Sequence, residues 1–321
     1  MENSLRVIGV VTLLVWLAPA AVEGQDSDFS PPRTPWGDPD FRGHFVAGTS
    51  APMENPIGDE WKLTAEEFRR YPTAKFFPDH NPAPGMKSMT RTMIIDPPNG
   101  QIPLQEWAIE KRQEIMANQD NLELLDPRVK CLPAALPRGN LPVGYNSYQF
   151  MQVPGAVIIL YEWNHHTRYI PLDDSPHVSS DIQLGMGDSR GHWEGNTLVV
   201  DVTNFTDNTW VTGHGAAPEG APATSLNTGH GVFHSTDLRV VERYSLVGEN
   251  TIHYEATISD PQVFTQPWTI SYDAFNRAPE WRALGSQVAV NFQNYRTASR
   301  MIRRVYKGKV VPRGGSNTER F

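Results

Sequence analysis

The sequence has almost no cysteine. Of its 321 residues only Cys131 is a cysteine, so an internal disulfide and a zinc site made of several thiolates are both excluded. It also lacks a Gly-x-Ser-x-Gly nucleophile elbow, a glycine loop that cradles phosphate and a dinucleotide-binding fingerprint. These absences argue against serine hydrolases and against NAD-dependent or nucleotide-dependent enzymes.

Long apolar runs are missing except at the N-terminus. Residues 7–18 are apolar apart from Gly9 and Thr12, follow Arg6, and precede Pro19 and several small residues. This order is typical of a secretory signal peptide, and the run is shorter than the roughly 20 residues that a membrane-spanning helix needs. We predict a signal peptide over residues 1–24, a secreted or periplasmic protein, and no membrane span.

A basic surface is also missing. The net charge is −8, and the one basic cluster lies near the C-terminus, between Arg300 and Lys309. We therefore expect a small-molecule substrate or ligand and no nucleic-acid partner. The 27 prolines predict many loops and few long helices.

The first part of the mature chain, residues 25–140, reads as a proline-rich arm. Residues 25–60 show little periodicity. Thr64 and Glu67 form a capping box that predicts a short helix. A second helix is predicted over residues 104–116, after Pro103 and with Trp107 among its apolar members, and a short strand over residues 92–96.

The second part, residues 141–321, reads as a series of antiparallel strands. Turn residues such as Pro154-Gly155 and Gly195-Asn196 separate them. We predict a mainly β fold, an antiparallel meander closing into a lipocalin-like (calycin-type) barrel with a short helical, proline-rich N-terminal elaboration. A glycine-rich loop over residues 213–231 is predicted to form a mobile flap. The predicted strands are residues 148–153, 157–163, 166–172, 192–194, 197–205, 238–247, 251–260, 268–274, 286–295 and 301–306.

Three carboxylates fall where strand alternation predicts apolar surroundings. Glu242 shares a face with Val240 and Tyr244, and Asp201 and Asp260 are similarly set. A buried carboxylate needs a partner. For Asp201 and Asp260 we favour an internal arginine. For Glu242 a salt bridge and a ligand site inside the barrel remain equal alternatives.

Histidines supply a second signal, because histidine titrates near neutral pH and performs most general acid–base catalysis. His165, His177 and His234 are the candidates, and a hydrogen-bonded loop position is the alternative reading of each. No cofactor is expected. A metal site built from these three histidines and Asp173 is a weaker alternative.

The chain resembles a large, mostly uncharacterised family of exported bacterial proteins. The resemblance covers nearly the whole mature chain. It rests on the run TPWGDPD from Thr34 to Asp40, the run WEGNTLVVD from Trp193 to Asp201, and a set of single residues. That set includes His165, Arg168, Asp173, His177, Trp210, His234, and Glu242 followed by Arg243.

The resemblance implies one site that gathers those polar residues, without giving a reaction. The chain departs from the family at residues 289–295, where AVNFQNY stands in place of a Cys-His-Glu run before Asn-Tyr. If that run is catalytic in relatives, this protein is a divergent enzyme or a binding protein.

We favour an enzyme of lyase, hydratase, isomerase or cyclase type, acting on a small natural product or sugar derivative. His165 or His234 would be the base, and Glu242 the acid or the orienting carboxylate. Arg168 would hold an anionic group, and the remaining substrate-binding candidates are Asp173, His177, Trp193 and Trp210. The alternatives are a lipocalin-like periplasmic carrier and a metal-dependent hydrolase.

Overall fold

The computed structural model describes a subset of the chain, and all that follows concerns that subset. It comprises residues 29–47, 49–50, 53–54, 87–88, 93–118, 121–124, 126–130, 132–141, 147–162, 166–212 and 231–278. The predicted signal peptide, the helix after Thr64, His165, most of the glycine-rich loop and the two C-terminal strands lie outside the described residues.

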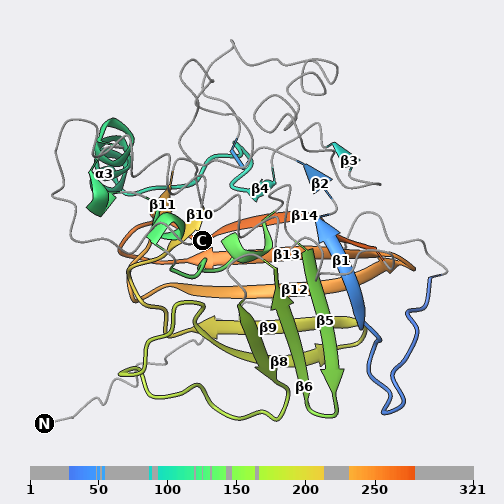
Figure 1. Cartoon of the computed structure of the whole chain (residues 1–321). Helices are drawn as coiled ribbons and strands as arrows, with labels where there is room; N and C mark the ends of the chain where they lie inside the picture. Colours follow the sequence, from blue (N-terminus) through green and yellow to red (C-terminus); the bar gives the residue numbers. More distant parts are fainter. Residues whose placement is uncertain are drawn as a thin grey trace, which may run out of the picture.

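One antiparallel sheet dominates the fold (Figure 1), and it confirms the predicted mainly β class. Along the sheet the strands follow the order β7-β6-β5-β1-β14-β13-β12-β9-β8, and β4 pairs with β14 beside this path. Their bounds are β1 Gly43–Ala47, β4 Ile94–Asp96, β5 Ser147–Val153, β6 Ala156–Tyr161, β7 Thr167–Pro171, β8 Asp188–Glu194, β9 Thr197–Thr203, β12 Arg239–Gly248, β13 Thr251–Ser259 and β14 Trp268–Arg277.

The sheet curls into a nearly closed barrel. Its two end strands, β7 and β8, lie beside each other. Arg168 on β7 donates from Nε to the hydroxyl of Ser189 on β8 at 3.0 Å. Gly191 on β8 allows the close approach, because a Cβ there would lie 2.7 Å from a methyl group of Ile170 on β7.

The arm contributes more to the barrel than its sequence predicts. β1 lies between β5 and β14 and pairs antiparallel with both. Among residues 43–46 of this strand only Phe45 and Val46 are apolar and buried, and they are adjacent, so the strand has too little alternation to be recognised from sequence. The sheet therefore draws strands from both sides of residue 141.

Alternation within the long strands holds as predicted. Glu242 and Tyr244 on β12, and Tyr254 on β13, all point into the barrel and are fully buried. Asp201 on β9 differs from its expected setting. Leu198 and Val200 take the inner positions, so Asp201 lies on the outer face with its side chain 31% exposed.

Short elements lie beside the large sheet (Figure 1). The predicted second helix is confirmed as α3, Glu106–Ala117, which buries Ala108 and Ile115 and leaves Trp107 50% exposed. The remaining elements are the 3-10 turns η2 (Leu122–Leu124), η3 (Pro127–Lys130) and η4 (Arg138–Asn140), and the paired strands β10 (Trp210–Thr212) with β11 (Val232–Phe233) and β2 (Thr49–Ser50) with β3 (Lys87–Ser88).

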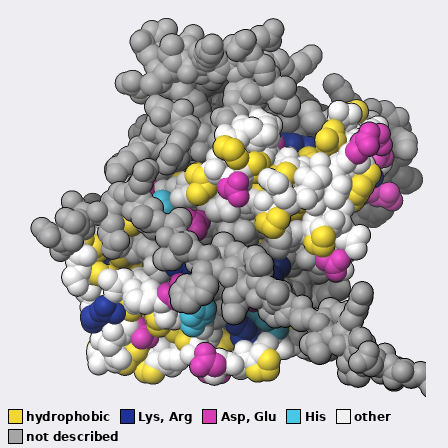
Figure 2. All heavy atoms as spheres, turned by 180° about the vertical axis from the view of Figure 1, so that it is seen from behind, with side chains coloured by type: hydrophobic (Ala, Val, Ile, Leu, Met, Phe, Trp, Pro, Cys, Tyr) yellow, Lys and Arg dark blue, Asp and Glu magenta, His cyan; other side chains and the backbone are white. Residues whose placement is uncertain are grey.

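The outer surface carries charges of both signs. On the face in Figure 2, acidic, basic and apolar side chains are interspersed. No helix within the described part of the chain is both long enough and apolar enough to cross a lipid bilayer.

Candidate functional site

The barrel interior holds a polar network centred on Glu242. Its Oε1 atom accepts hydrogen bonds from Tyr254 at 2.7 Å, Tyr244 at 2.9 Å and the Asn140 amide at 2.9 Å, and Oε2 forms an ion pair with Arg168. Arg168 also donates to the Tyr244 hydroxyl at 3.1 Å and is only 4% exposed. Of the two alternatives for Glu242, the structure shows the salt bridge.

The side chains of this network donate their hydrogen bonds to one another, inside the barrel. Burial lowers the pKa of Arg168, but the Glu242 carboxylate and neighbouring tyrosines outweigh it, so that the net pKa is raised. Burial raises the pKa of Tyr161, which donates to Asn140, to about 12. The tyrosines therefore stay neutral donors, and we interpret the network as a structural plug of the barrel rather than as an acid–base pair.

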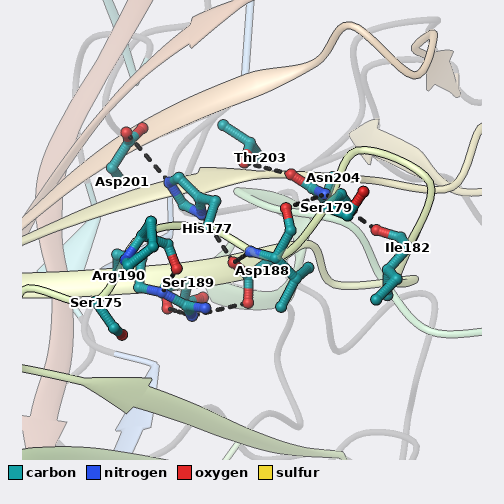
Figure 3. Close-up of polar contacts among 12 residues, drawn as sticks. Ser175, His177, Ser179, Ile182, Asp188, Ser189, Arg190, Asp201, Thr203 and Asn204 are labelled. Carbon is teal, nitrogen blue, oxygen red and sulfur yellow. Dashed lines mark hydrogen bonds and ion pairs between the residues drawn. The ribbon is translucent and has the colours of Figure 1, made fainter.

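His177 lies in a second place, outside the barrel wall (Figure 3). Its Nδ1 is 2.8 Å from Asp188 Oδ2, and its Nε2 is 3.4 Å from Asp201 Oδ2. Arg190 pairs with Asp188 and Arg239 with Asp201, both at 2.8 Å. Asp201 therefore has an arginine partner, but the pair lies exposed on the outer face and not inside the protein as predicted. Each carboxylate around His177 thus already has a guanidinium partner.

Hydrogen bonds hold the loop between β7 and β8 next to this cluster. The side-chain amide of Asn204 donates to the carbonyls of Val178, Ser179 and Ile182. Asp173 closes a turn in the same loop by accepting the N–H of Ser175 at 3.1 Å. His177 therefore anchors the loop to the outer face of β8 and β9, and Asp173 stabilises a turn within the loop.

His234 lies in a third place, beside a surface pocket of about 420 Å³ between α3 and the β10–β11 pair. The pocket also brings in Trp210, so two of the predicted residues meet here. Its lining is Trp107, Lys111, Ile115, Glu123, Leu124, Asp207, Trp210, Phe233, His234, Ser235 and Thr236.

Hydrogen bonds fix the tautomer of His234. Its Nδ1 is 2.9 Å from the Ser235 carbonyl, which can only accept, so Nδ1 carries the proton. Nε2 lies 2.8 Å from the hydroxyl of Thr209. In the neutral ring Nε2 is the basic nitrogen and accepts from that hydroxyl.

Asp260 fixes the position of Ser235, the residue that binds Nδ1 of His234. Its carboxylate accepts the Ser235 N–H at 2.6 Å, the Ser235 hydroxyl at 2.9 Å and the Gln262 N–H at 3.1 Å. The predicted arginine partner of Asp260 is wrong for the described residues, because backbone and hydroxyl donors satisfy the carboxylate instead. Asp260 thereby positions Ser235, and through it His234.

Burial sets the charge state of His234. The side chain is 4% exposed, and this desolvation lowers its pKa, although Asp260 and Asp207 act in the opposite direction. A lowered pKa keeps the imidazole neutral at neutral pH, which a general base requires.

Comparison with known proteins gives no match for this chain among protein-family models, curated proteins or solved structures.

One further cluster imitates a catalytic triad. His253 contacts Asp273 through Nδ1 at 3.0 Å and the Ser271 hydroxyl through Nε2 at 2.9 Å. However, Ser271 stands in the middle of β14, where its N–H is bonded to the Met93 carbonyl and Glu255 faces it in register. Acyl transfer needs free N–H donors for an oxyanion, and this position offers a carboxylate instead.

The expected single site is therefore divided. Arg168 and Glu242 meet in the barrel, His177 and Asp173 hold a loop, and His234 with Trp210 lines the pocket. Trp193 packs edge-to-face on Phe41 at 5.3 Å. Within the described ranges, no group of three histidine, cysteine or acidic side chains could hold a metal.

Sequence reasoning missed three of the residues that organise these places. Thr209, Asn140 and Asp188 make the decisive contacts of His234, Glu242 and His177. Each lies in or next to a loop, where no periodic pattern marks a side chain. Only the strand order brings them to their partners.

Proposed function

We propose that the protein is an enzyme that performs cofactor-independent acid–base chemistry on a small, partly apolar molecule in the His234 pocket. The observation that carries this proposal is a neutral imidazole of fixed tautomer in the wall of an aromatic pocket. The predicted signal peptide supports action after export, in the periplasm or outside the cell.

In this proposal His234 takes a proton from a carbon or hydroxyl of the substrate through Nε2. The Thr209 hydroxyl, which occupies Nε2 at rest, has a second acceptor in the Thr206 carbonyl at 3.5 Å. Nε2 becomes available to the substrate when the Thr209 side chain rotates so that its hydroxyl oxygen leaves this nitrogen. Return of the proton to another atom gives isomerisation, and loss of a leaving group gives elimination.

The orienting groups around His234 support the same role. The Ser235 carbonyl holds Nδ1–H, and Asp260 holds Ser235 by two hydrogen bonds. A catalytic base needs a partner of this kind, because the second nitrogen sets the tautomer and the direction of the ring. Positive charge gained by His234 during the reaction is stabilised by Asp260 and Asp207.

A carrier of an apolar molecule is the second candidate. The satisfaction of both ring nitrogens of His234 within the fold favours it, because a carrier needs no reactive group. In that case the same pocket binds a ligand and returns it unchanged.

The test compares turnover by wild type and by His234→Gln across a library of small natural products and sugar derivatives, with products detected by mass spectrometry. Glutamine can still contact Thr209, so the fold should persist. We expect turnover to fall by about 10²-fold or more. His192→Gln is the matched control, since His192 is exposed and its side chain makes a polar contact only with Glu194 among the described residues.

Equal turnover by wild type and His234→Gln would show that His234 is not the catalytic base. Ligands that bind both proteins and are recovered unchanged would instead establish the carrier.

A further inference from the structure

Three aromatic side chains from three separate elements line the His234 pocket. Trp107 comes from α3, Trp210 from β10 and Phe233 from β11. The Trp107 and Phe233 rings lie 5.4 Å apart between centroids. The pocket wall therefore carries aromatic rings, as ligand sites for organic cations do. Trp107 is half exposed, whereas Trp210 is 8% exposed and already has the Arg138 guanidinium over its ring at 5.9 Å, so Trp107 and Phe233 are the rings open to a ligand.

These rings are held in place. The indole N–H of Trp107 donates to the Gln262 carbonyl at 3.0 Å. Trp210 packs on the backbone of Gly231, where an added Cβ would lie 2.0 Å from the indole ring. Rigid rings lose little conformational entropy when a ligand binds, so they form a prepared surface.

The charged groups of the pocket are mainly acidic. Glu123 and Asp207 line it and are exposed, and the one lining cation, Lys111, is paired with Glu114 at 2.8 Å. With His234 neutral, the unbalanced charge in the pocket is negative. Asp207 also acts on His234 electrostatically, so its charge reaches the buried wall of the pocket.

Aromatic faces and carboxylates attract the same class of ligand. Ring quadrupoles present negative charge to a cation, and a carboxylate adds direct attraction. We infer that the His234 pocket recognises an organic ammonium ion, and that the substrate carries this group next to the position where His234 acts. That the ammonium ion is part of a substrate rests on the proposed function, whereas the binding of a cation in this pocket does not.

The test is isothermal titration calorimetry of the full protein with choline and with 3,3-dimethylbutan-1-ol, its uncharged carbon analogue of similar shape. We expect choline to bind about tenfold more tightly at low ionic strength. Asp207→Asn should weaken choline binding by about fivefold and leave binding of the alcohol unchanged. Asp181→Asn, which removes the same charge from an exposed loop outside the pocket, is the matched control.

Equal affinities for choline and the alcohol, or choline binding that does not respond to Asp207→Asn, would overturn the inference. The proposed function is tested separately by His234→Gln. Loss of turnover of an uncharged compound in that variant, with no choline selectivity, leaves the proposed function standing and removes the cation. Selective choline binding without any turnover that depends on His234 would support the cation site and remove the proposed function.

Discussion

At the scale of single residues, the chemistry of His234 depends on two ordinary contacts. The Ser235 carbonyl fixes the proton on Nδ1, and the Thr209 hydroxyl covers Nε2. Burial then disfavours the charged ring and lowers its pKa. His177 contains the same imidazole, yet two carboxylates with their own arginine partners surround it, and it serves as a loop anchor.

The lowered pKa of His234 predicts a pH-dependent stability. In the unfolded chain the imidazole takes up a proton near its ordinary pKa of 6.5, whereas the folded protein resists protonation until a lower pH. The unfolded state therefore binds more protons in this window, and the free energy of unfolding falls as pH drops below about 6.5. We expect the melting temperature to fall between pH 7.5 and pH 5 in wild type, and to fall less in His234→Gln.

The pH window separates this effect from that of the carboxylates. The pKa of Asp201 is lowered from 3.8 because Arg239 outweighs burial, so its stabilising contribution is lost only in a more acidic range. His192→Gln controls for the loss of an exposed histidine. Identical melting curves against pH for wild type and His234→Gln would show that His234 is not held neutral by the fold.

At the scale of elements, glycines at two turns allow a direct comparison. Gly155 lies in the β5–β6 turn at φ +80°, and Gly187 precedes β8 at φ +70°. Both need a left-handed backbone, which costs an alanine about 1 kcal/mol. A Cβ at Gly155 meets nothing within 4 Å, whereas one at Gly187 would lie 2.7 Å from the Thr203 carbonyl and 2.8 Å from the Phe205 ring.

Gly187→Ala should therefore cost more than Gly155→Ala. Both variants lose the same free energy to the strained backbone. The additional loss in Gly187→Ala therefore comes from overpacking, which costs about 1–3 kcal/mol. Urea unfolding followed by circular dichroism measures both variants. Equal losses would mean that the loop before β8 can move away from β9 without cost.

The strands that could be predicted from sequence are those whose neighbours in the chain are also their neighbours in space. β12 and β13 form a hairpin, and their alternation correctly placed Glu242 inside. β1 and η4 could not be predicted, because both are held by distant strands rather than by local pattern. The same limit applies to the site: Glu242 was expected to need a partner, but only barrel closure identifies Arg168.

At the scale of the whole molecule, Asn140 connects parts of the chain that are far apart. Its side chain bonds to Glu242 and Tyr244 on β12 and to Tyr161 on β6, and its carbonyl accepts from Tyr272 on β14 at 2.9 Å. One residue of a 3-10 turn therefore ties three strands of the barrel together from inside. This makes η4 part of the cooperative core rather than a surface loop.

Asn140→Ala tests this role. It removes one of the four partners of the Glu242 carboxylate and the acceptor of the Tyr161 hydroxyl in a buried setting, where an unsatisfied group costs about 1–3 kcal/mol. We expect the free energy of unfolding to fall by about 3 kcal/mol in urea. The shift should be the same by tryptophan fluorescence and by circular dichroism, because one transition includes the whole barrel. Asn208→Ala, at an exposed position, should cost less than about 0.5 kcal/mol. A loss below about 1 kcal/mol for Asn140→Ala, or transitions that separate by probe, would mean that the barrel is stable without its plug.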